Sequence, residues 1–162
     1  MDIKKLKPTG PWKSGKYTPV NPKKYIGDIH AIIWRSSWER RFCQYCDMHP
    51  NILKWTSEPL AIPYWNPIDK KEHEYFVDYY IKVETTGGNI EEWLIEVKPE
   101  NQYDIKKKPQ QPTGNITEKK IREYNYKLST WITNRAKFEA ATRFAKARGY
   151  QFGAINENFK YQ

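Results

Sequence analysis

The sequence predicts an α/β fold in a single domain. Its 162 residues are enough for one domain with its own buried core, and no internal repeat divides them. Segments that alternate apolar and polar residues are typical of strands, and they are interspersed with segments that carry helix start and stop signals. Strands and helices mixed along one chain indicate the α/β class.

Three helices are expected. The first opens at Ser36–Glu39 and runs to about Met48, where Pro50 stops it. Its apolar-leaning stripe follows helical spacing and consists of Trp38, Phe42, Tyr45 and His49. The other two helices span residues 118–128, capped by Thr117, and residues 134–148, ended by Gly149.

Two longer strands are predicted at residues 75–83 and 93–98, and Thr85–Asn89 between them is typical of a hairpin turn. On the first strand one face carries Tyr75, Val77, Tyr79, Ile81 and Val83, and the other carries Phe76, Asp78, Tyr80 and Lys82. On the second strand, Glu96 and Lys98 share a face with Leu94. Shorter strands are expected at residues 60–62, bounded by Pro59 and Pro63, and at 151–155.

Asp78, Glu96 and Lys98 could together hydrolyse a phosphodiester. Two carboxylates from neighbouring strands can hold Mg²⁺, and a lysine two residues further along emerges on the same face. If Asp78 lies opposite Glu96, Thr85 pairs with Asn89 and the loop is residues 86–88. A two-residue loop would move Asp78 to the other face, so the hypothesis requires the longer loop or a bulge.

Each of these residues also has an ordinary structural interpretation. Asp78 could lie on the wet face of a half-covered strand, and Glu96-x-Lys98 could be a surface ion pair. Ser36-x-x-Glu39 is a capping box, in which the glutamate binds a backbone N–H of the first turn. The spacing Cys43-x-x-Cys46-x-x-His49 suits zinc in residue type, but it lacks a fourth ligand, so the cysteines are expected in the core.

The chain is strongly basic, with a formal net charge of +9, which favours polyanions such as nucleic acid. An irregular basic arm is expected at residues 1–28, followed by the main domain at 29–162 with a basic loop at 99–116. The predicted DNA-contacting residues are Lys106, Lys107, Lys108, Lys119, Lys120, Arg135 and Lys137, with further basic residues Arg122, Arg143 and Arg148 on the same helices. No segment predicts a membrane span or a signal peptide, so a cytoplasmic protein is expected.

The order of these motifs carries a resemblance. Arg35–Glu39 begins a helix, Tyr75–Asp78 ends in a carboxylate, and Ile95-Glu96-Val97-Lys98-Pro99 follows one hairpin later. This order resembles the PD-(D/E)xK nuclease superfamily and, within it, the TnsA-like endonucleases. A narrower similarity, to the head completion nucleases of T4-like tailed phages, covers roughly residues 15–160 and includes Tyr17–Asp28, Cys46-Asp47, Trp55–Glu58, Ile62-Pro63-Tyr64, Lys137–Ala141 and Phe152–Phe159.

The resemblance implies a restriction-endonuclease-like fold, in which helices flank a mixed central sheet, and Mg²⁺-dependent cleavage of DNA, with Mn²⁺ as a substitute. Asp78, Glu96, Glu39 and the backbone carbonyl of Val97 would hold the metal, and Lys98 would position the attacking water. Glu39 could serve only if it turns inward. The proline that the family carries before its aspartate is Val77 here, which weakens the motif more than the mechanism.

The same resemblance implies a task in phage assembly, namely processing or checking the ends of packaged double-stranded DNA during head completion. Portal or neck proteins would then be partners, and the protein would act in the host cytoplasm or remain with the virion. Two alternatives stay open: a structural or DNA-binding factor without significant cleavage, and a transposase-type endonuclease subunit that works with a partner protein.

Overall fold

The central element of the fold is a four-stranded sheet with strand order β3–β6–β7–β8. The structure is a computed structural model that describes residues 14–98 and 107–156. Strands β3 (Ile52–Ser57), β6 (Tyr79–Glu84) and β7 (Ile90–Val97) are antiparallel, whereas β8 (Gln151–Ile155) runs parallel to β7. The expected mixed sheet is therefore confirmed, as is the α/β class.

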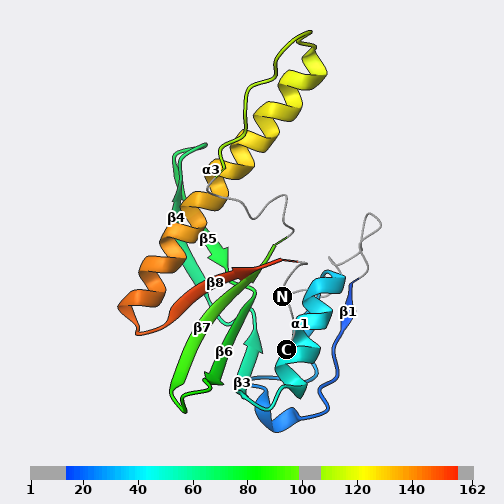
Figure 1. The fold of residues 1–162 in the computed structure, drawn as a ribbon, viewed down its shortest axis with the longest axis vertical. Coiled ribbons are helices and arrows are strands. Elements are labelled where there is room, and N and C mark those ends of the chain that lie inside the picture. The colour runs from blue at the N-terminus through cyan, green and yellow to red at the C-terminus, as the bar shows by residue number, and fades with distance from the viewer. Residues whose placement is uncertain (1–13, 99–106, 157–162) are drawn as a thin grey trace.

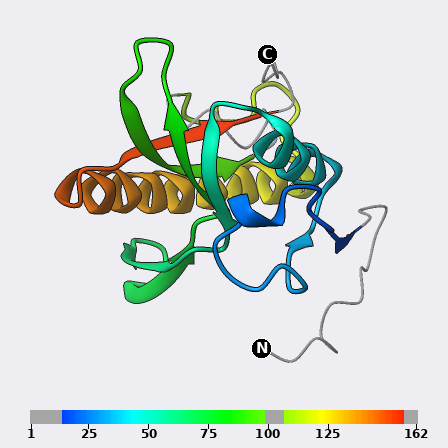
Figure 2. The same ribbon diagram turned by 90° about the horizontal axis from the view of Figure 1, so that it is seen from below.

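The two long helices cover opposite faces of this sheet (Figures 1 and 2). Helix α1 (Ser37–Met48) packs on one face, and α3 (Glu118–Ala147) packs on the other. The core on the α1 side consists of Ile32, Phe42, Cys43, Cys46, Ile52, Trp55, Tyr79, Ile81, Ile95 and Val97. The core on the α3 side consists of Ile62, Tyr64, Tyr75, Val77, Leu94, Ala140, Ala141 and Ala145. Each face of the sheet is thereby removed from water, which supplies most of the driving force for this fold.

Strands β4 (Ala61–Asn66) and β5 (Lys71–Phe76) form a separate two-stranded hairpin that packs against α3. The prediction that a strand ends before Pro63 is wrong, since Pro63 lies inside β4 opposite Glu74. Both strands of a two-stranded sheet are edges, and an edge strand tolerates a residue without an N–H.

The expected single strand at residues 75–83 is interrupted at Val77 and Asp78. Tyr75 and Val77 belong to the core on the α3 side, whereas Tyr79 and Ile81 belong to the core on the α1 side. The prediction that these alternate residues share one face is therefore wrong. The chain leaves the β4–β5 hairpin, changes sides at Asp78 and enters the central sheet.

The register of the β6–β7 hairpin is the one that the nuclease hypothesis requires. Tyr79 pairs with Ile95 and Glu84 with Ile90. The Thr85 N–H donates to the Asn89 carbonyl at 2.8 Å, so the loop is residues 86–88. Gly88 takes a positive φ of 77°, a conformation that glycine adopts at no steric cost. The prediction of an odd-length loop is confirmed.

Helix α3 is one continuous helix of 30 residues, so the prediction of two helices with a break near residue 130 is wrong. Thr130, Thr133 and Asn134 are weak helix formers, but each costs only a few tenths of a kcal/mol, roughly, relative to good ones. Burial of Phe138 and of the alanines beyond it offsets that cost. The N-terminal half of α3 projects past the sheet (Figure 1).

Residues 14–34 pack along α1 and β3. Strand β1 (Gly15–Lys16) pairs with β2 (Ile33–Trp34), and a short 3-10 helix, η2, spans Pro22–Lys24. The buried carboxylate of Asp47 accepts hydrogen bonds from the Tyr17 hydroxyl and from the backbone N–H groups of Val20 and Asn21. Within the described part of the chain, no helix has the length and apolar character needed to cross a membrane.

Candidate active site

Asp78 lies beside the C-terminal end of β7, where the chain enters β6. Its Oδ2 atom accepts a hydrogen bond from the backbone N–H of Val97 at 2.8 Å. Its own carbonyl accepts from the N–H of Glu58, the residue after β3, at 2.8 Å. These two contacts fix the aspartate between the ends of β3 and β7.

Glu96 is buried, with 3% of its surface exposed, and both of its carboxylate oxygens accept hydrogen bonds. Lys98 Nζ lies 2.9 Å from Oε1, and the Tyr75 hydroxyl donates to Oε2 at 2.5 Å. Lys98 follows Glu96 by two residues, so the alternation of a strand brings both side chains to the same face. The predicted neighbours Glu96 and Lys98 are thus in direct contact.

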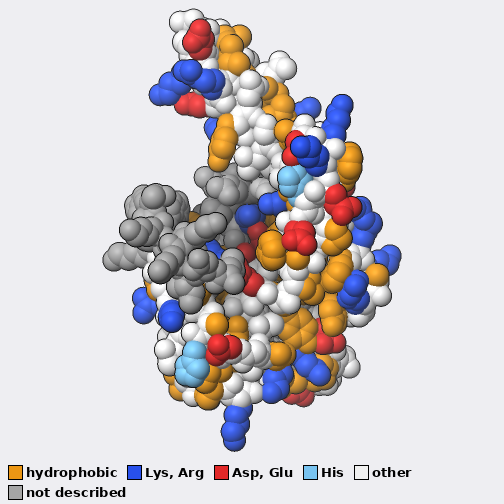
Figure 3. Space-filling view, turned by 180° about the vertical axis from the view of Figure 1, so that it is seen from behind, with side chains coloured by type: hydrophobic (Ala, Val, Ile, Leu, Met, Phe, Trp, Pro, Cys, Tyr) orange, Lys and Arg blue, Asp and Glu red, His pale blue; other side chains and the backbone are white. Residues whose placement is uncertain are grey.

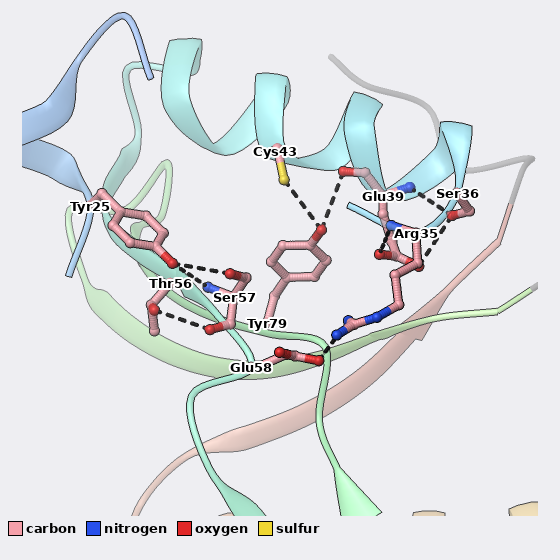
Figure 4. Close-up of polar contacts among 9 residues, drawn as sticks. All are labelled: Tyr25, Arg35, Ser36, Glu39, Cys43, Thr56, Ser57, Glu58 and Tyr79. Carbon is pink, nitrogen blue, oxygen red and sulfur yellow. Dashed lines mark hydrogen bonds and ion pairs between the residues drawn. The ribbon is translucent and has the colours of Figure 1, made fainter. Parts of the chain in front are cut away.

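Glu39 lies in the first turn of α1, where it forms a variant of the expected capping box, since its side chain reaches the N–H of the residue before the N-cap (Figure 4). Its backbone N–H donates to Ser36 Oγ at 3.1 Å, and its Oε2 accepts from the Arg35 N–H at 2.8 Å. The Tyr79 hydroxyl donates to the Glu39 carbonyl at 3.3 Å, which ties the start of α1 to β6. The cap thus holds the Glu39 carboxylate where helix α1 begins above the sheet.

The three carboxylates act on one another electrostatically. Burial raises the pKa of Asp78 well above its usual value, and the charges of Glu96 and Glu39 raise it further. Burial likewise raises the pKa of Glu39, and the charge of Glu96 adds to this, although its hydrogen bonds to Arg35 and Ser36 oppose the shift. Asp78, Glu96 and Glu39 therefore belong to one acidic cluster.

Two lysines face this acidic cluster. Burial alone would lower the pKa of Lys98, but the negative charges of Glu96, Asp78 and Glu39 outweigh it and raise the pKa. Lys137, which enters from α3, has its pKa lowered by burial and by the nearby charge of Lys98. The cluster thus stabilises the charged form of Lys98, whereas the surroundings of Lys137 disfavour its charged form.

The cluster has the residue types of a site for a hard cation. Among residues 14–98 and 107–156, however, no three acidic, histidine or cysteine side chains are already arranged so that they could hold a metal ion. Carboxylate oxygens are the ligands that Mg²⁺ and similar ions prefer. Glu96 is buried and Asp78 and Glu39 are half-buried, and holding carboxylates together away from water is unfavourable unless positive charge compensates it. The residue types therefore fit a divalent cation, which their carboxylates would have to turn toward.

Arg35 and Glu58 were not among the predicted site residues. Arg35 Nη1 lies 2.6 Å from Glu58 Oε1, and this pair joins the residue before the N-cap of α1 to the residue after β3 (Figure 4). The Arg35 N–H donates to the Glu39 carboxylate and the Glu58 N–H donates to the backbone carbonyl of Asp78, so the pair joins the two segments that hold these acidic residues. Both residues lie in segments that carry the resemblance, Arg35–Glu39 and Trp55–Glu58, but the sequence does not predict a contact between them.

The predicted DNA-contacting residues lie in different settings. Lys106 is outside the described residues, and Lys107 and Lys108 are exposed before α3. Lys119 and Lys120 are exposed in the first turn of α3. Arg135 is exposed, contacts Glu139 at 3.4 Å and lies over the Trp131 ring. Figure 3, which shows the side of the molecule opposite to that in Figure 1, has acidic side chains interspersed among the basic ones.

Cys43 and Cys46 are both buried and free. Cys43 Sγ lies 3.2 Å from the Tyr79 hydroxyl, and Cys46 has no exposed surface. His49 caps the C-terminal end of α1 and packs against the Tyr45 ring. The two cysteines thus fill the core between α1 and the sheet, as expected.

A mixed sheet with helices on both faces is consistent with the restriction-endonuclease-like class of fold, and Asp78, Glu96 and Lys98 lie at the ends of its adjacent strands. Residues 49–157 match the family described as TnsA-like endonuclease N terminal, and the chain belongs to that family. It is 36% identical over 145 residues to the head completion nuclease of Enterobacteria phage T4, covering 90% of this chain and 91% of that protein. No solved structure matches the chain.

The family match covers Asp78, Glu96 and Lys98 but begins ten residues after Glu39. The place of Glu39 in the site therefore does not rest on the family match and stays a prediction.

Proposed function

We propose that this protein is a metal-dependent DNA endonuclease in which Asp78, Glu96 and Glu39 hold Mg²⁺ and Lys98 orients the attacking water. The observation that carries the proposal is the register of β6 and β7, which brings Asp78 to the end of β7 beside Glu96 and Lys98. A bound divalent cation would supply positive charge to the phosphoryl oxygens and lower the pKa of a bound water. Mn²⁺ would serve as a substitute for Mg²⁺.

The chain's own residues divide the remaining work. The Val97 N–H holds Asp78 in place, and the Tyr75 hydroxyl holds Glu96, so neither carboxylate has to be ordered when the ion arrives. The Lys98 ammonium has three donors, one of which binds Glu96, and the others can orient a water toward phosphorus. Glu39 would turn one oxygen from its capping contacts toward the ion. The backbone carbonyl of Val97 is a further proposed ligand.

Nicking of supercoiled plasmid in the presence of Mg²⁺ tests this proposal. We expect Asp78→Ala and Glu96→Ala each to abolish nicking while DNA binding is retained, because they remove ligands and not cationic groups. Lys98→Ala should lower turnover far more than the affinity for Mn²⁺. The exposed residue Glu74 on β5 provides a matched control, and Glu74→Ala should cleave at the wild-type rate. Nicking that survives Asp78→Ala and Glu96→Ala would contradict the assignment.

The biological task that we propose is head completion in a tailed phage, because a nuclease of that name is similar over nearly the whole chain. The substrate would be the ends of packaged double-stranded DNA, and portal or neck proteins would be the partners. A structural or DNA-binding factor would bind plasmid without nicking it. A transposase-type subunit would require particular end sequences and would cleave sheared genomic DNA poorly.

Exposed basic residues along α3 and the segment before it would bind the DNA backbone on either side of the cut. Five of these residues are exposed, so their charged groups are solvated in the free protein and can reach phosphates: Lys107, Lys108, Lys119, Lys120 and Arg135. Their contribution would be affinity without sequence preference. Lys106 stays in this proposal on sequence grounds alone.

A further inference from the structure

Lys137 differs from the other basic residues of α3 because it is half-buried and lies inside the fold. Its Nζ atom is 5.8 Å from the ring centre of Tyr64 on β4 and 5.6 Å from that of Tyr75 on β5. The β4–β5 hairpin packs on α3 and brings both tyrosines to the lysine. Cation–π contacts of this kind restrict where the ammonium can lie.

The same tyrosine connects Lys137 to the acidic cluster. The ring of Tyr75 contacts the ammonium of Lys137, and the hydroxyl of the same tyrosine donates to Glu96 at 2.5 Å. The charges of Glu96 and Asp78 act on Lys137, and so does the charge of Lys98. Lys137 and Lys98 therefore approach one group of carboxylates, the first from α3 and the second from β7.

Lys98 and Lys137 differ in whether a carboxylate pairs with their ammonium group. Lys98 is paired with Glu96 at 2.9 Å, whereas Lys137 makes no ion pair with any residue in the described ranges. Keeping a lysine half-buried without a carboxylate partner is unfavourable in the free protein. A negatively charged ligand at the cluster would offset that cost, and a phosphodiester is such a ligand.

We propose that Lys137 is an active-site residue that contacts the phosphate being cleaved and stabilises the negative charge it gains during hydrolysis. This inference rests on the proposed nuclease function. Lys137 forms and breaks no covalent bond, and its ammonium stays protonated while water replaces the leaving ester oxygen on phosphorus. Tyr64 and Tyr75 are positioning residues, because they direct the ammonium to the cluster without contacting the substrate.

The test compares Lys137→Met with wild type in single-turnover cleavage at saturating DNA, using Mg²⁺ and a labelled duplex. We expect the cleavage rate to fall by about 100-fold to 1,000-fold, as when one preorganised donor to a transition state is removed. DNA affinity measured by fluorescence anisotropy in Ca²⁺ should change by less than about threefold, since one phosphate contact among many is lost. The Mn²⁺ concentration that gives half-maximal rate should not change, which separates this role from positioning of the ligands.

Two further variants make the outcome decisive. Lys146→Met removes a lysine from the exposed last turn of the same helix and should cleave like wild type. Lys137→Arg keeps the charge and should recover part of the rate. If Lys137→Met cleaves at the wild-type rate once saturated, and only its affinity is reduced, the inference is overturned. If wild type itself fails to cleave with Mg²⁺ or Mn²⁺, the proposed function fails instead.

Discussion

Asp78 and Glu39 each have a raised pKa, because burial and the charge of Glu96 disfavour their ionised forms. Below the usual carboxyl pKa, both residues are protonated in the folded and the unfolded chain. As pH rises, the unfolded chain loses these protons first, so the folded protein binds more protons and its stability falls with pH. The loss is complete only once the pH exceeds the raised pKa values.

We therefore predict that these two carboxylates lower the free energy of unfolding of the metal-free protein as pH rises from the usual carboxyl range toward neutrality. Urea unfolding in EDTA across this range measures it. Asp78→Asn should remove part of the fall and should be more stable than wild type at neutral pH, because no buried charge replaces the aspartate. Mg²⁺ should stabilise wild type and not this variant. An Asp78→Asn protein that follows the wild-type pH profile would contradict the account.

The residues of the site differ in how far the sequence could predict them. Glu96 and Lys98 could be paired from strand alternation, and Asp78 could be set beside Glu96 once the hairpin loop was given an odd length. The contact of Tyr75 with Glu96 and the position of Lys137 near the acidic cluster could not be predicted, because both depend on how the β4–β5 hairpin packs on α3. Short-range patterns carry no information on such long-range packing.

The elements were predictable where their pattern was regular. Helix α1 and strand β8 have the expected bounds, whereas β3 was not predicted at all. Its buried residues Ile52 and Trp55 are three apart, because the register with β6 shifts between Ile52 and Lys54. A bulge of this kind breaks the period of two on which strand prediction depends.

At the scale of the hairpin, Gly88 should set the register on which the site depends. We predict that Gly88→Ala destabilises the protein by roughly 1–2 kcal/mol, the cost of a left-handed conformation for a residue with a Cβ. Its φ is 77°, and no atom lies within 4 Å of an added Cβ, so the strain is conformational alone. Urea unfolding measures the difference.

Gly87 is the matched control for this prediction. It lies next to Gly88 in the same loop, but it has no positive φ, and an added Cβ would meet its nearest neighbour, Asn89 Nδ2, at 3.7 Å. Gly87→Ala should therefore be close to neutral, because an alanine also restricts the unfolded chain. Equal losses in the two variants would mean that crowding, and not the backbone conformation of Gly88, limits the loop.

In the molecule as a whole, the active site and the proposed DNA-binding surface are joined by one helix. Lys137 is in the half of α3 that packs on the sheet, and Lys119 and Lys120 begin the half that projects beyond it (Figure 1). Two separate helices, as the sequence suggested, could have set these residues at any angle. Because α3 is continuous, the spacing between the acidic cluster and the exposed lysines is fixed, at about 1.5 Å per residue.

We finally predict where the net charge of +9 acts on DNA. The logarithm of the binding constant should fall linearly with the logarithm of salt concentration, with a slope of about 0.9 per phosphate contact. Lys119→Ala with Lys120→Ala should reduce the magnitude of that slope by about two, because both residues would contact phosphates. Lys23→Ala with Lys54→Ala removes the same charge from the opposite end of the molecule and should leave the slope unchanged. Anisotropy titrations of a labelled duplex in EDTA measure both slopes. An equal reduction in the two double variants would show that the overall charge, and not the projecting half of α3, governs the salt dependence.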